Sequence, residues 1–125
     1  MANKKKFDLK ERTAKFGEDI IGFAKKIPNP RFNRGPIILP LITQLVKAGT
    51  SVGANYCEAD CAESKKDFEH KIGICKKESK ESKYWFRVIA KAVLQLKDKA
   101  KIYWKEAIEL NLIFSSIIIK SKQKK

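Results

Sequence analysis

The sequence predicts an all-α protein folded as an up-down-up-down four-helix bundle. In four segments, apolar residues recur at intervals of three and four, and no segment of useful length shows strand-like alternation. The connections between these segments are short, which favours antiparallel neighbours. A chain of 125 residues with 43% hydrophobic residues can build one core, so we expect a single domain over 1–125 with basic tails at about 1–6 and 120–125.

The first helix and the connector after it are marked by an apolar stripe followed by proline and glycine. The stripe consists of Phe16, Ile20, Phe23 and Ile27. The connector over 28–36 is extended and carries Arg31 and Arg34. The second helix is predicted to begin at about Ile37 or just after Pro40, because proline is tolerated in a first helical turn. Its expected inward residues are Ile38, Leu41, Ile42, Leu45, Ala48 and Val52.

A line of small residues runs along the second helix. Gly49, Gly53, Cys57 and Cys61 recur every four residues and therefore share one face. Each glycine costs about 1 kcal/mol relative to alanine in a helix interior, so the line is expected to let another helix or a partner chain approach closely. The alternative is a weak or kinked helix that ends near Gly53.

The third helix is predicted to start after Ser64, which forms a capping box with Asp67, and to run to about Leu96. The fourth is predicted to start with Asp98 as its N-cap. Apolar residues at helical spacing mark both helices: Phe68, Ile72, Cys75, Phe86, Ile89, Val93 and Leu96 in the third, and Ile102, Leu110, Ile113 or Phe114, and Ile117 in the fourth. Trp85, Tyr103 and Trp104 are interpreted as core or interface aromatics rather than a ligand cage.

The middle of the chain resembles a known bacterial family. The residues concerned are Thr50-Ser51-Val52-Gly53-Ala54-Asn55 with Glu58, Asp67-Phe68, Lys77-Glu78-Ser79 with Glu81, and Tyr84-Trp85. They are similar to the four-helix-bundle proteins encoded in intervening sequences of 23S ribosomal RNA genes. The match is clear over about 40 residues, and the flanking helices fit it. Where that family has a glycine turn after the asparagine, this chain reads Tyr56-Cys57-Glu58-Ala59, which favours a more continuous helix.

The resemblance implies several properties that the residues alone do not. The family shares its fold with the accessory protein of diversity-generating retroelements, a pentameric bundle that binds nucleic acid and works with a reverse transcriptase. For this chain the resemblance therefore implies a homopentamer, a nucleic-acid partner and no enzymatic activity.

The charge distribution gives an independent indication of a polyanionic partner. The chain has 28 Lys+Arg and 14 Asp+Glu, a net charge of +14. Without seven lysines of the tails the balance is still 21 against 14, or +7. Five cations of the third helix step by 4, 3, 4 and 4 and therefore share one face. Together with the connector arginines, they are the predicted nucleic-acid-binding residues: Lys76, Lys80, Lys83, Arg87, Lys91, Arg31 and Arg34. The alternative is a solvated lysine face that only keeps the protein soluble.

Catalytic, metal and membrane functions are not expected. A single histidine, His70, excludes a multi-histidine zinc site within one chain. Asp67 and His70, three residues apart, resemble one element of a di-metal bundle, but that site needs a second such motif and two more glutamates. Cys57 and Cys61 are interpreted as buried packing residues rather than metal ligands, and no cofactor is predicted. Three cysteines and a charged stretch where a signal peptide needs apolar residues indicate a cytoplasmic protein. The longest apolar stretches are about half the roughly 20 residues needed to cross a bilayer.

The sequence thus predicts a noncatalytic basic bundle that binds RNA or DNA through its phosphate backbone. An adaptor that docks an acidic protein partner, such as a reverse transcriptase, is the alternative.

Overall fold

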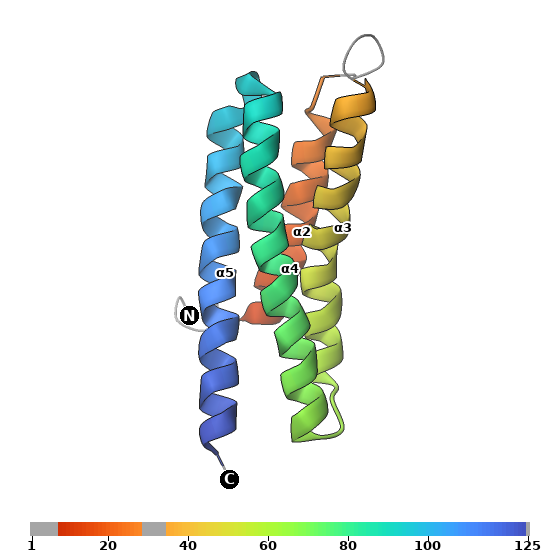
Figure 1. Cartoon of the computed structure of the whole chain (residues 1–125). Coiled ribbons are helices and arrows are strands. Elements are labelled where there is room, and N and C mark those ends of the chain that lie inside the picture. Colours follow the sequence, from red (N-terminus) through yellow and green to blue (C-terminus); the bar gives the residue numbers. More distant parts are fainter. Residues whose placement is uncertain (1–7, 29–34, 125) are drawn as a thin grey trace.

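The computed structural model describes residues 8–28 and 35–124 and shows four long helices side by side (Figure 1). They are α2 (Leu9–Lys25), α3 (Gly35–Asp60), α4 (Lys65–Ala92) and α5 (Lys97–Gln123), with a 3-10 turn, η1 (Leu94–Leu96), between the last two. Each helix packs mainly on its neighbours in sequence, and α2 also contacts α5, which closes the bundle. The predicted all-α, up-and-down four-helix arrangement is confirmed.

Aromatic rings fill the centre of the bundle. Phe86 of α4 lies edge-on to Phe23 and Phe16 of α2, with ring centroids 5.4 and 6.4 Å apart, and both Phe23 and Phe86 approach Tyr103 of α5. The contacts of Phe86 with Phe16 and Phe23 join α4 to α2, which lie diagonally opposite each other in the bundle. Lower down, Phe114 is fully buried and its ring lies 6.4 Å from that of Tyr56. The half-buried Trp85, Tyr103 and Trp104 pack against this core, as expected.

An ion pair connects the first and last helices. The guanidinium of Arg12 donates from Nε and Nη2 to both carboxylate oxygens of Glu106, at 2.8 and 2.7 Å. The hydrogen bond to Glu106 raises the pKa of Arg12 above its ordinary value. A paired, two-point contact of this kind fixes the orientation of the two side chains, and so helps to set α2 against α5.

The small-residue line of α3 does bring a second helix close, and that helix is α2. A Cβ added at Gly53 would lie 3.1 Å from the backbone oxygen of Thr13, and one at Gly49 would overlap the side chain of Ile20. The helix does not end near Gly53, as the alternative supposed, but continues to Asp60. Cys57 and Cys61 lie beyond the close approach and are exposed, so the prediction that they are buried is wrong.

We expect a Gly53→Leu variant to be destabilised by about 1–3 kcal/mol, because a side chain there must push against the backbone of α2. Gly73 provides the control, since a Cβ at that position would have no neighbour within 4 Å. Gly73→Ala should therefore stabilise the protein by up to about 1 kcal/mol through helix propensity alone. Urea denaturation measures both; a Gly53→Leu variant as stable as the parent would argue against close packing of α2 on α3.

Several helix ends differ from the sequence prediction. Helix α3 begins at Gly35 and includes Pro40, which removes one helical hydrogen bond without ending the helix. Helix α4 stops at Ala92 rather than continuing to Leu96, because Val93 leaves the helical conformation (φ −128°, ψ 82°). Asp98 lies in the first turn of α5 and is not its N-cap, which is Leu96. Ser64 is confirmed as the N-cap of α4, since its hydroxyl accepts a hydrogen bond from the Asp67 N–H at 3.0 Å. The hydrogen bonds of the described residues do not include the reciprocal bond from the Ser64 N–H to the Asp67 carboxylate that would complete a capping box.

One inward position of α5 was also predicted wrongly. Ile102 is 59% exposed, whereas Ala100 and Ala107 are buried. Two residues along a helix correspond to about 200° of rotation, so a residue two positions from Ala100 points away from the core.

Helix α3 is the one described helix that is long and apolar enough to cross a membrane by length and composition. Its most apolar 18-residue window has a mean hydropathy of 1.4, so the sequence estimate of apolar length was too short. A mostly buried core helix of a bundle can have the same composition; in α3, Leu45, Ala48 and Val52 are buried, but only 28% of that window is. The absence of a membrane partner stays a prediction.

Candidate nucleic-acid interface

The five predicted cations of α4 lie together along one flank of the helix. We call Lys76, Lys80, Lys83, Arg87 and Lys91 the cationic row. At about 100° per residue they fall within an arc of about 80°, beside the buried face formed by Cys75, Ser79, Ser82 and Phe86. Helix α5 lies beside this part of α4, since the side-chain amide of Asn111 donates to the backbone oxygen of Lys76 at 2.8 Å. At the other end of the row, Arg87 lines a pocket with residues of α5, and Arg87 and Lys91 also line a groove with residues of α3.

The charges of this row are available to a partner. Lys76, Lys80, Arg87 and Lys91 are exposed, and Lys83 is half-buried. A half-buried lysine can keep its ammonium in water while its aliphatic stem covers apolar surface. Within residues 8–28 and 35–124, the salt bridges use other cations, namely Arg12, Lys15, Lys71 and Lys122. No described carboxylate is therefore within ion-pair distance of the row.

Acidic residues of α4 are separated from the row. Between His70 and Ala92 the helix has two carboxylates, Glu78 and Glu81, which lie on the flank that faces α3. Burial, and then repulsion from Glu81, raises the pKa of Glu78 above its ordinary value, and the charges of Lys77 and then Lys47 of α3 oppose the rise. Between His70 and Ala92 the carboxylates of α4 thus lie on the side of α3, away from the row. Elsewhere the charges of α4 are not divided in this way, because Glu69 contacts Ser121 and Lys122 of α5, and Lys71 pairs with Glu58 of α3.

Small residues bring α4 and α5 close together and so place cations of α5 beside the row. Ser79 and Ser82 of α4 are fully buried, and their hydroxyls donate to the α4 backbone oxygens of Lys76 and Glu78 at 2.9 Å. Across the interface, Ala100 and Ala107 are also buried. These small residues let the two helices approach, whereas Phe86 and Trp104 lie between them nearer the start of α5. Cations of both helices therefore lie on one surface.

Helix α5 contributes cations that the sequence prediction missed. Lys97, Lys101 and Lys105 are exposed and spaced by four, so they form a second line on one face of α5. Lys97 and Lys101 line the same pocket as Arg87 of the cationic row. Their spacing is visible in the sequence, but only the packing of α5 on α4 shows that Lys97 and Lys101 lie on the same surface as Arg87.

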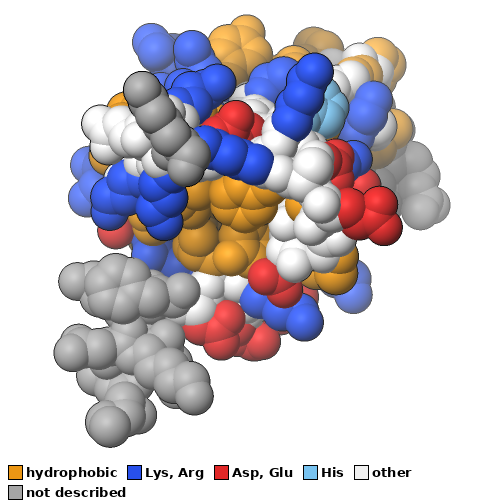
Figure 2. Space-filling view, turned by 90° about the horizontal axis from the view of Figure 1, so that it is seen from below, with side chains coloured by type: hydrophobic (Ala, Val, Ile, Leu, Met, Phe, Trp, Pro, Cys, Tyr) orange, Lys and Arg blue, Asp and Glu red, His pale blue; other side chains and the backbone are white. Residues whose placement is uncertain are grey.

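The lower end of the bundle is rich in cations. Figure 2 shows apolar side chains at the centre of this end and Lys and Arg around much of its edge, most densely at the upper left. Asp and Glu form smaller patches between them, most clearly at the right and below.

Some predicted cations cannot be placed. Arg31 and Arg34 lie outside the described residues, as do Lys4, Lys5, Lys6 and Lys125 of the tails. Of the described tail lysines, Lys122 lies 3.9 Å from Glu69.

The cysteines offer no arrangement for nucleophilic or metal chemistry in the described part of the chain. Cys75 is buried, its thiol donates to the Val52 oxygen at 3.5 Å, and burial raises its pKa to about 12, so it is protonated at neutral pH. Cys57 and Cys61 are exposed. No group of three or more His, Cys, Asp and Glu side chains that could hold a metal occurs among the residues described.

Comparison with known proteins agrees with this fold. The protein is similar to a crystal structure of a protein of unknown function from the S23 ribosomal protein family of Bacteroides thetaiotaomicron, with 27% sequence identity and a TM-score of 0.75. The similarity covers 87% of this chain and 96% of the other. No curated protein matches the sequence. The profile of the 23S rRNA-intervening sequence proteins matches residues 5–116, and the chain therefore belongs to the 23S rRNA-intervening sequence protein family.

Proposed function

We propose that this protein is a noncatalytic, nucleic-acid-binding bundle that holds RNA or DNA by its phosphate backbone. The observation that carries the proposal is the cationic row: five neighbouring cations on one flank of α4, with no described carboxylate paired to them. In addition, Glu78 and Glu81 lie on the other flank of α4. A lysine face that serves only solubility would not need to be kept apart from the acidic residues of the same helix.

The mechanism is electrostatic. From Lys76 to Lys91 the row extends about 22 Å along the helix axis, and Lys97 and Lys101 broaden it toward α5. Lysine and arginine side chains on phosphate oxygens release condensed counterions from the nucleic acid, which favours binding. Phosphate contacts position a protein on its ligand but carry no sequence information, so we propose binding without base-specific readout along the row.

Binding measured as a function of salt tests this function. The logarithm of the association constant should fall linearly with the logarithm of salt concentration, and affinities for unrelated sequences of equal length should be similar. Fluorescence anisotropy with labelled RNA and DNA gives both quantities. A protein that binds one sequence strongly and others not at all, with little salt dependence, would contradict backbone recognition.

We also propose that the chain assembles with copies of itself, as a homopentamer. Support comes from the family resemblance and from a groove of about 890 Å³ between the end of α3 near Gly35 and the end of α4 near Ala92, here called the α3–α4 groove. It is lined by apolar side chains that include Ile37, Tyr84 and Leu94, which are 65%, 56% and 67% exposed. Exposed apolar clusters of this kind mark interaction surfaces.

Light scattering tests the assembly. The unmodified protein should have a mass several times 14.3 kDa, and the double variant Ile37→Gln, Leu94→Gln should shift toward 14.3 kDa because it makes the α3–α4 groove polar without changing the charge. The circular dichroism of the variant should stay helical. A parent protein that is monomeric at micromolar concentration would refute the oligomer.

The adaptor function remains the second candidate, because the cationic row adjoins the apolar α3–α4 groove: Arg87 and Lys91 line it. An acidic protein with apolar anchors, such as a reverse transcriptase, would fit a surface of that composition. Absence of nucleic-acid binding by the unmodified protein at low salt would favour this function over the first.

A further inference from the structure

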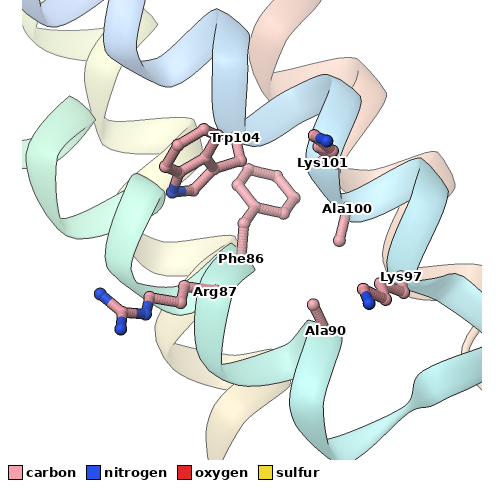
Figure 3. A pocket seen from close by; sticks show the side chains of 7 residues that line it. All are labelled: Phe86, Arg87, Ala90, Lys97, Ala100, Lys101 and Trp104. Carbon is pink, nitrogen blue, oxygen red and sulfur yellow. The ribbon is translucent and has the colours of Figure 1, made fainter.

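A pocket of about 330 Å³ opens between α4 and α5 beside the cationic row (Figure 3). It exists because two alanines face each other across the interface, Ala90 from α4 and Ala100 from α5, where larger side chains would fill the space. The fully buried ring of Phe86 and the half-buried indole of Trp104 form its apolar wall. The remaining lining residues are Arg87, Lys97 and Lys101.

We propose that this pocket receives an unpaired nucleobase of a single-stranded nucleic acid, whose backbone lies on the surrounding cations. The proposal rests on the function proposed above and adds the strand type and the position of one base. It defines Trp104 as the stacking residue, and Arg87, Lys97 and Lys101 as the contacts to the adjoining phosphates.

The composition of the pocket supports this ligand over others. A nucleotide combines a flat apolar ring with a nearby negative charge, and the lining combines aromatic and methyl groups with three cations and no carboxylate. Single-strand-binding proteins use this combination, stacking bases on aromatic side chains while a basic groove follows the backbone. The volume lies at the lower end of the range for small-molecule pockets, about 300–1,000 Å³, which is suitable for one base rather than a large ligand.

The geometry also predicts which strands can bind this way. A base in a duplex is stacked between its neighbours and paired, so it cannot enter a pocket unless it is first turned out of the helix. The cationic row can contact the phosphates of either form. We therefore expect the pocket to add affinity for single strands and none for duplexes.

The test uses Trp104 as its own reporter. A Trp85→Phe background leaves Trp104 as the remaining tryptophan, since the chain has two and Trp85 does not line the pocket. Titration with a short single-stranded oligonucleotide should quench the fluorescence of Trp104, whereas a duplex of the same sequence should bind with little quenching. A nucleoside monophosphate alone should quench only at much higher concentration, because it lacks the neighbouring phosphates; quenching at equal concentration would overturn the strand requirement.

Two variants separate base insertion from loss of folding. Trp104→Leu keeps apolar volume but removes the stacking surface, and Ala90→Leu fills the pocket while Trp104 stays in place. Each should weaken single-strand binding by about 5- to 100-fold, the equivalent of one stacked base, and leave duplex binding unchanged. Circular dichroism should be that of the parent.

The possible failures can be distinguished. If the parent binds single strands with a steep salt dependence but Trp104 is not quenched and both variants bind like the parent, the pocket proposal is overturned and the backbone function stands. If the parent binds neither strands nor duplexes, both are overturned.

Discussion

Glutamine in place of Lys76, Lys80, Lys83 and Arg87 is expected to weaken nucleic-acid binding strongly and to reduce its dependence on salt. Glutamine is a good helix former, so α4 should persist while up to four phosphate contacts are lost. Each lost contact reduces the slope of log affinity against log salt by about 0.9 for duplex DNA, so four reduce it by up to about 3.6, and by less for a single strand. Anisotropy titrations at several salt concentrations measure both effects.

A charge-matched variant shows whether position or total charge matters. Glutamine at Lys10, Lys25, Lys26 and Lys47 also removes four cations, all of them exposed on α2, its C-terminal end and α3, so each variant has a net charge of 14 − 4 = +10. If the cationic row is the binding surface, this control should keep most of the affinity and nearly all of the salt slope. Equal losses in the two variants would instead indicate a diffuse attraction to a positive protein.

Phe114→Ala is expected to be the most destabilising of the variants considered for folding, with a loss of about 3–5 kcal/mol. Phe114 belongs to α5, and its ring is fully buried in the core beside Tyr56 of α3. Removing the ring leaves a cavity that the helices can fill only in part. Native domains have about 5–15 kcal/mol of stability in total, so this loss would remove a large fraction of it. Urea denaturation at a fixed protein concentration measures the loss, since self-association would otherwise shift the midpoint.

Leu112→Ala is the matched control for this variant. Leu112 lies two residues earlier on the same helix and is 62% exposed, so its truncation should change the free energy of unfolding by no more than about 0.5 kcal/mol. If the two variants lost similar stability, the assignment of the buried face of α5 would be wrong.

The fold could be predicted because its strongest determinants are local. The apolar stripe of α2 and the Ser64 cap of α4 are patterns of neighbouring residues, and both hold in the structure. The glycines at 49 and 53 predicted a close approach by a helix, although not that the helix would be α2.

Errors arose where tertiary packing or backbone geometry decides. Val93 continues the apolar pattern of α4, but its backbone leaves the helix, which moves the start of α5 to Lys97. Cys57 was expected to be buried because it extends the glycine line, yet the contact with α2 is confined to positions nearer Gly49 and Gly53.

The candidate site was predictable only where the spacing of residues along one helix determines it. The cationic row follows from the helical period alone, and the structure places its members on one flank. The contribution of Lys97 and Lys101, and the pocket between two alanines, depend on how α5 packs against α4. No spacing within either helix encodes that juxtaposition.

Lysine footprinting tests directly whether the α4–α5 face is the nucleic-acid interface. Exposed lysines are acetylated with and without a saturating single-stranded oligonucleotide, and the modified positions are read by mass spectrometry. If the α4–α5 face binds the strand, Lys76, Lys80, Lys83, Lys97 and Lys101 should be protected and the labelling of Lys10, Lys25, Lys26 and Lys47 should be unchanged. Protection confined to the terminal tails, or shared equally by the lysines of α2 and α3, would contradict an interface on the α4–α5 face.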